Sequence, residues 1–139
     1  MRKTTNIPRE ESLNAISHSL GAILSVFGLI LLLQRNTNKT DYALTSIIIY
    51  GTTLISMFTV SALYHAVSKV TLKRILRISD HINIYFLIAG TYTPVALITL
   101  EDGNGWSILF LVWSIAAIGT LLKLFFTGKY EFISLILYL

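Results

Sequence analysis

Three histidines, His18, His65 and His81, lie at the ends of very apolar segments of this chain. His18 is near the start of the first segment, His65 ends the second, and His81 starts the third directly after Asp80. Consecutive spans cross a bilayer in opposite directions, so these three ends are expected on one side of the membrane. Imidazole and carboxylate groups are costly inside a membrane, and a cluster of them indicates function. Both groups bind zinc, so we predict a metal site.

Zinc chemistry suits these residue types. A catalytic zinc site keeps one position for a water molecule and lowers the pKa of that water to about 7. The carboxylate of Asp80, placed beside this water, would orient it or accept its proton. Ser61 lies one helical turn before His65 and would hold the imidazole or a substrate.

Glu11, Asn14 and His18 are spaced by three and four residues, so they share one helical face. Structural roles are the alternative for each polar residue. Glu11 would stabilise a helix N-terminus, Asp80 would be the N-cap of the third span, and His65 would be an interfacial histidine bonded to a neighbour. The common depth of the histidines favours a site over these separate roles.

Composition indicates an integral membrane protein. Of 139 residues, 54% are hydrophobic and 13% are charged, whereas soluble domains carry about 25% charged residues. The chain has no cysteine, which excludes disulfides and thiolate metal sites. The net charge is +4, but the basic residues lie between apolar blocks. They therefore indicate membrane topology, and no nucleic-acid partner is expected.

Four apolar blocks, at about 13–33, 42–67, 82–100 and 105–127, predict four membrane spans. A span needs about 20 helical residues, and blocks of this length in lipid must be helices because their backbone hydrogen bonds close internally. A fifth apolar run, 132–139, is too short to span. We therefore expect one all-α membrane domain over 1–139, with four full spans and the start of a fifth, incomplete at its C-terminus.

Proline and glycine residues inside the spans lead to two further expectations. Pro94 should kink the third helix and free a carbonyl. Small residues let membrane helices approach closely, and five glycines are placed to do so: Gly21, Gly28, Gly51, Gly90 and Gly119.

The distribution of Lys and Arg predicts the orientation. The segments before the first span, between the second and third, and at the end of the fourth hold Arg2, Lys3, Arg9, Lys69, Lys73, Arg74, Arg77, Lys123 and Lys129. The opposite loops hold Arg35 and Lys39, with the acidic Asp41, Glu101 and Asp102. Loops rich in Lys and Arg stay in the cytoplasm. The N-terminus and the histidines are therefore expected on the cytoplasmic side.

Three stretches carry a resemblance to a known family: "EESLNAISHSLGAILSVFGLILLL", "SALYH" and "SDHINIYFLIAGTYTP". They are similar to the Glu, Asn, His opening of the first span, the Ser-x-x-x-His of the second, and the Asp-His stretch running into Thr-Tyr-Thr-Pro of the third. The chain resembles, over essentially its whole length, the hemolysin III family of bacterial membrane proteins, which belongs with the progestin and adipoQ receptors.

The resemblance implies a seven-helix bundle in the bacterial inner membrane with a cytoplasmic N-terminus. It implies that His65 is a zinc ligand, that Asp80 approaches the zinc-bound water, and that Ser61 is the motif serine. Glu11, Asn14 and His18 match the motif of the first span, and His81 is typical of the bacterial branch. The two further zinc ligands of the receptors lie in a His-x-x-x-His motif that these 139 residues lack. A site completed by His18 and His81 is the alternative.

Three functions remain open from the sequence. The receptors resemble ceramide-hydrolysing enzymes, which implies a zinc-dependent hydrolase acting on a lipid amide or ester. The family name implies a cytolytic pore, although no span shows the amphipathic face of a pore. The third is a membrane sensor or structural protein whose metal only braces helices.

Overall fold

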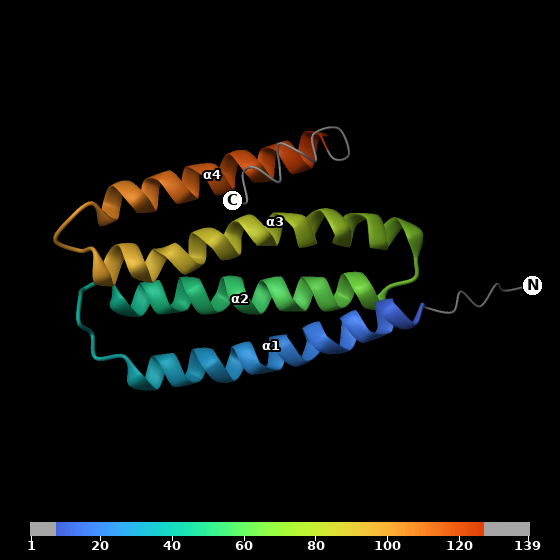
Figure 1. Cartoon of the computed structure of the whole chain (residues 1–139), viewed down its shortest axis with the longest axis horizontal. Coiled ribbons are helices and arrows are strands. Elements are labelled where there is room, and N and C mark those ends of the chain that lie inside the picture. The colour runs from blue at the N-terminus through green and yellow to red at the C-terminus, as the bar shows by residue number, and fades with distance from the viewer. Residues whose placement is uncertain (1–7, 127–139) are drawn as a thin grey trace, which may run out of the picture.

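Four long helices lie side by side in chain order (Figure 1). The computed structural model describes residues 8–126. The helices are α1 (Arg9–Arg35), α2 (Ala43–Ala66), α3 (Val70–Pro94) and α4 (Gly105–Phe126), and α3 continues into a π-helical segment, η1 (Val95–Thr99). Most packing is between helices that are adjacent in the chain, and residues 8–126 contain no strand.

All four helices are long and apolar enough to cross a membrane. Much of their aliphatic and aromatic surface is exposed, including Leu24, Phe27, Phe110 and Phe125. Such surface is compatible with lipid contact, because hydrocarbon tails are as apolar as these side chains. The predicted all-α architecture with four spans is confirmed. The apolar run at 132–139 lies outside the described residues.

The third helix starts earlier than its apolar pattern predicted. It begins at Val70 rather than near residue 82, and its N-cap residue is Lys69. The interpretation of Asp80 as an N-cap is therefore wrong, since Asp80 lies almost three turns inside α3. The reason is that Lys, Arg and Leu are good helix formers, so the basic link to the third span is itself helical.

Glycines permit close approach at three helix interfaces. At four of the five predicted positions, an added Cβ would collide with a facing side chain. The pairs are Gly21 with Phe58, Gly51 with Leu29, Gly90 with Thr53, and Gly119 with Tyr85. Gly28 differs, because nothing lies within 4 Å of a Cβ built there.

The interface of α3 with α4 holds the best-buried cluster of the described residues. Tyr85 is 1% exposed and packs with Ala89 and Ala116. Beside it, the indole of Trp113 donates a hydrogen bond to Thr93, with 3.2 Å between Nε1 and Oγ1. This contact fixes α4 against the C-terminal half of α3.

Pro94 marks a change in helix type. It is the last residue of α3, and a π turn follows in which the N–H of Leu100 bonds to the carbonyl of Val95. Proline lacks the N–H that would bond to the carbonyl of Gly90. Beyond Pro94 the helix continues through a wider turn, and the kink stays a prediction.

Candidate functional site

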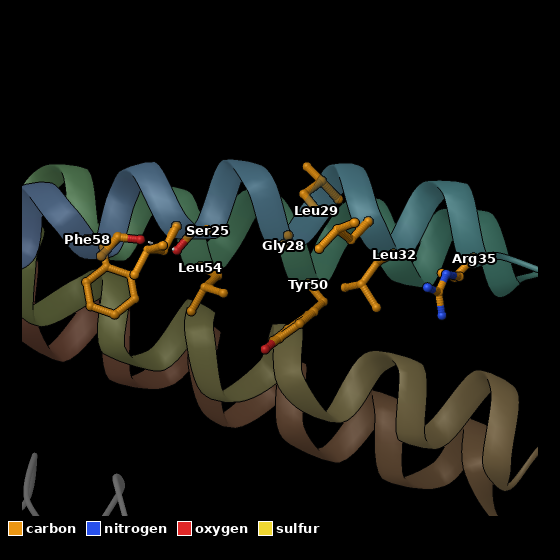
Figure 2. Close-up of a pocket in the computed structure, with 12 residues that line it drawn as sticks. Ser25, Gly28, Leu29, Leu32, Arg35, Tyr50, Leu54 and Phe58 are labelled. Atoms are coloured by element: carbon orange, nitrogen blue, oxygen red, sulfur yellow. Dashed lines mark hydrogen bonds between the residues drawn. The ribbon is translucent and has the colours of Figure 1, made fainter.

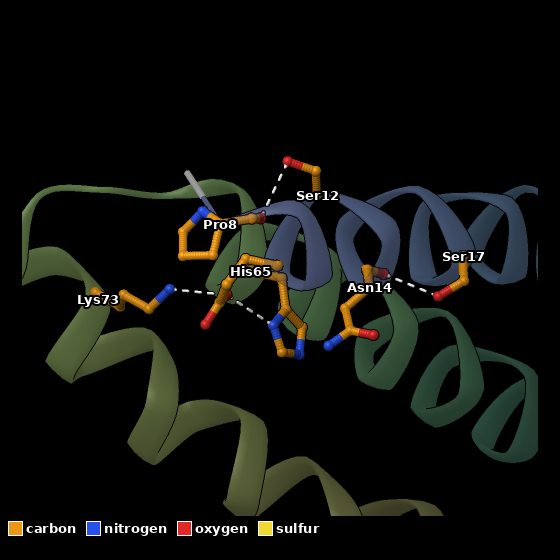
Figure 3. A network of polar contacts seen from close by, with 7 residues as sticks. Pro8, Ser12, Asn14, Ser17, His65 and Lys73 are labelled. Carbon is orange, nitrogen blue, oxygen red and sulfur yellow. Dashed lines mark hydrogen bonds and ion pairs between the residues drawn. The ribbon is translucent and has the colours of Figure 1, made fainter. Parts of the chain in front are cut away.

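Glu11 joins three helices at one end of the bundle (Figure 3). Its Oε2 accepts a hydrogen bond from Nζ of Lys73 in α3, at 2.8 Å. The same oxygen lies 2.9 Å from Nδ1 of His65, at the end of α2. All three side chains are part-buried, at 26% exposed for Glu11, 30% for Lys73 and 17% for His65. The carboxylate is therefore shared by an ammonium group and an imidazole.

Further along α1 from Glu11, His18 stacks on His65. The two imidazole rings stack almost parallel, with 5.6 Å between their centroids and 3° between their planes. Asn14 lies between Glu11 and His18 on the same face of α1, and its side chain points toward His65 in Figure 3. The spacing in the first span thus does bring one face of α1 against His65.

The contact with Glu11 orients the imidazole of His65. With its proton on Nδ1, His65 donates to the carboxylate, which leaves the lone pair of Nε2 for a ligand. Metal-binding histidines usually hold their second ring nitrogen in this way, because a carboxylate partner fixes the tautomer and raises ligand basicity. With its proton on Nδ1, His65 has a hydrogen bond of this kind.

Asp80 lies on the face of α3 that carries Lys73, seven residues and about 10 Å further along the helix. Its Oδ1 is buried and has no hydrogen-bond partner within residues 8–126. A buried carboxylate oxygen without a donor is unfavourable and calls for a partner. Ser61 is also buried, one turn along α2 from His65 and at 3% exposure. His81 is half-buried, about 100° around α3 from Asp80.

These donors fit zinc only in part. No three His, Cys, Asp or Glu side chains of the described residues are grouped so that they could hold a metal ion. His18 and His65 face each other with their rings, whereas two ligands of one ion point their nitrogens at a common centre. The residues present therefore offer one oriented imidazole, His65, and one buried oxygen, on Asp80.

Sequence reasoning did not predict that Lys73 and Tyr64 belong to this cluster. The sequence indicates only a topology role for Lys73, yet its ammonium group bonds to Glu11 and lies 5.0 Å from the ring centroid of Tyr64. The Tyr64 ring in turn lies 4.7 Å from that of His65. The positions of Lys73 and Asp80, seven apart, would have indicated a common face once the early start of α3 was known.

Comparison with known proteins decides the family. The family described as "Haemolysin-III related" matches residues 7–139. The chain belongs to this haemolysin-III family. It is 37% identical over 131 residues to "Hemolysin-3" of Bacillus cereus, covering 94% of this chain and 60% of the relative. It is also 37% identical over 132 residues to "Hemolysin-3 homolog" of Bacillus subtilis, covering 94% and 62%.

A more distant relative is human "Monocyte to macrophage differentiation factor", 27% identical over 135 residues, which cover 94% of this chain and 56% of the relative. The haemolysin-III chain thus spans about three fifths of the length of the curated bacterial relatives it matches. No solved structure matches it. It is a multi-pass membrane protein with bacterial homologues.

Proposed function

We propose that Glu11, His65 and Asp80 belong to a zinc-dependent site of a membrane hydrolase that acts on a lipid amide or ester. The observation that carries the proposal is the 2.9 Å contact of Glu11 with Nδ1 of His65, which leaves Nε2 as the nitrogen that would bind a metal when the proton is on Nδ1. By the distribution of Lys and Arg, the site would face the cytoplasm.

Each residue has a role in this proposal. A zinc ion bound by His65 would supply a water molecule whose pKa is near 7. Oδ1 of Asp80, which has no hydrogen-bond partner within residues 8–126, would orient that water or accept its proton. Glu11 would hold the imidazole in its ligating tautomer, and Ser61, one turn away, would hold the imidazole or the substrate. The His-x-x-x-His ligands of related receptors are not among these 139 residues, so the proposal concerns the contribution of this chain to the site.

A lipid substrate is supported by a groove between α1 and α2 (Figure 2). Its volume is about 640 Å³, and it extends from Gly21 and Phe58 to Arg35, over about 21 Å of α1. Most of its lining is leucine and glycine, and Gly28 leaves it open. The ring of Phe58 lies 5.9 Å from that of His18. An acyl chain in the groove would therefore place its carbonyl end beside the two histidines.

Hydrolysis of a fluorescent lipid amide and of the matching ester by the purified chain in detergent tests the proposal. We expect a chelator or His65→Ala to reduce hydrolysis to the background rate. Glu11→Gln should reduce hydrolysis about 10- to 100-fold, because it removes the partner that orients the ligand. The matched control is Glu10→Gln, an exposed neighbour on α1. Hydrolysis that survives both the chelator and His65→Ala would exclude a zinc hydrolase.

Membrane lysis is the second candidate function, and the word "hemolysin" in the names of the two bacterial relatives favours it. Release of a dye from liposomes that is unaffected by chelator would support lysis over hydrolysis. A metal that only braces the helices would instead give a chelator-sensitive melting temperature without turnover.

A further inference from the structure

A basic cleft lies where α2 ends and α3 begins. Its volume is about 290 Å³, and it is lined by Tyr64, Ser68, Val70, Lys73, Arg74 and Arg77. Three of these six residues are cationic, and none is acidic. A water molecule occupies about 30 Å³ in the liquid, so the cleft has room for a larger group than a single ion.

The cleft is built by one face of α3. Val70, Lys73, Arg74 and Arg77 are spaced by three, one and three residues, and this spacing places them on the same side of a helix. The ammonium of Lys73 is fixed by Glu11 at 2.8 Å and by the ring of Tyr64. Arg74 is exposed and forms no ion pair within residues 8–126. The cleft therefore combines a held ammonium group with an available guanidinium group.

One exposed aliphatic side chain lies beside these cations. Val70 lines the cleft and is 83% exposed, whereas the exposed Leu72 and Ile75 lie on the opposite side of α3. The helix that carries them is long and apolar enough to cross a membrane. Anionic headgroups are concentrated at the surface of a membrane, where they attract the cations that flank a membrane-spanning helix.

We propose that this cleft binds the phosphate headgroup of an anionic phospholipid. Arg74 pairs with the phosphate oxygens, which arginine matches in a two-pronged geometry. Lys73 and Arg77 add positive charge to the cleft, and Ser68 offers a hydroxyl donor at its rim. The inference does not require zinc or any hydrolytic activity.

Retention of phosphatidylglycerol by the purified chain, measured by native mass spectrometry across a lipid titration, tests the proposal. A juxtamembrane cation contributes about 1 kcal/mol to the binding of an anionic lipid, so Arg74→Gln should weaken binding about five-fold. The control is Lys39→Gln, which removes an exposed cation from the link between α1 and α2 and should leave the affinity unchanged. Circular dichroism of both variants verifies that the helices are retained.

Two competitors distinguish the sources of phosphate. Short-chain phosphatidylglycerol should displace the bound lipid, and inorganic phosphate at equal concentration should not. Displacement by inorganic phosphate would overturn the assignment to a lipid and indicate a site for free phosphate. Equal weakening by Arg74→Gln and Lys39→Gln, or equal affinity for zwitterionic phosphatidylcholine, would overturn the cleft as a specific headgroup site.

Discussion

Glu11 and His65 lie 2.9 Å apart, although 54 positions separate them along the chain. Glu11 also holds Lys73, so a single carboxylate ties the first three helices together at the end where the histidines stack. This arrangement has a structural consequence that can be measured apart from any metal.

Glu11→Gln should lower the free energy of unfolding by about 1 kcal/mol. The substitution keeps the shape of the side chain but removes the charge that both Lys73 and His65 contact. A hydrogen bond to a charged group contributes about 1.5–3 kcal/mol when buried, and partial exposure reduces this value. Unfolding in mixed micelles of dodecyl maltoside and SDS measures the change. Glu10→Gln should stay within ~0.5 kcal/mol of wild type, and an equal loss in both variants would contradict the account.

The polar contact of α2 with α3 should also contribute to stability. Ser56 donates a hydrogen bond to Oδ1 of Asn83 at 2.6 Å, and Asn83 is buried. Ser56→Ala removes this donor, so we expect a loss of about 1 kcal/mol, the usual scale for such bonds between membrane helices. Thr52→Ala is the control, because the Thr52 hydroxyl bonds only to carbonyls of its own helix. The same micelle unfolding assay compares them, and similar losses would count against the interhelical bond.

Gly119→Ala should be clearly destabilising, by about 1–3 kcal/mol. The added methyl group would meet the ring of Tyr85, which is 1% exposed and has no space to move into. Gly28→Ala makes the same chemical change where nothing lies within 4 Å, so it should be neutral or slightly stabilising through better helix propensity. Melting temperatures of the two variants provide the measurement. Equal effects would mean that α4 does not pack on Tyr85 as described.

The orientation of the helices can be tested with single cysteines, because the chain has none of its own. Ser68→Cys lies in the link between α2 and α3, and Asp102→Cys lies in the opposite loop between η1 and α4. If the N-terminus is cytoplasmic, an impermeant thiol reagent should label Asp102→Cys in intact cells and Ser68→Cys only after permeabilisation. The reverse pattern would place the cluster around His65 on the outer side.

The fold could be predicted from the sequence because apolar block length decides which segments cross a bilayer. The start of α3 could not, since hydropathy marks where a segment becomes apolar, whereas the helix follows backbone propensity through Lys73, Arg74 and Arg77. The misplacement of Asp80 as a helix cap followed from that error.

The candidate site could be predicted only in part from the sequence. The spacing of Glu11, Asn14 and His18 defines a helical face, and alternating span direction brings that face to the end of α2, where His65 lies. Which residue of α3 completes the contact depends on the rotation of that helix about its axis. Packing determines this rotation, so the role of Lys73 became visible only in three dimensions.

The central claim is that His65, oriented by Glu11, is a zinc ligand. The zinc content of the detergent-purified chain, compared among wild type, His65→Ala and His81→Ala, tests it most directly. Because the described residues offer one oriented imidazole and one carboxylate oxygen, the account predicts less than one zinc per chain in wild type and in His81→Ala, and none in His65→Ala. Equal zinc content in wild type and His65→Ala would contradict it.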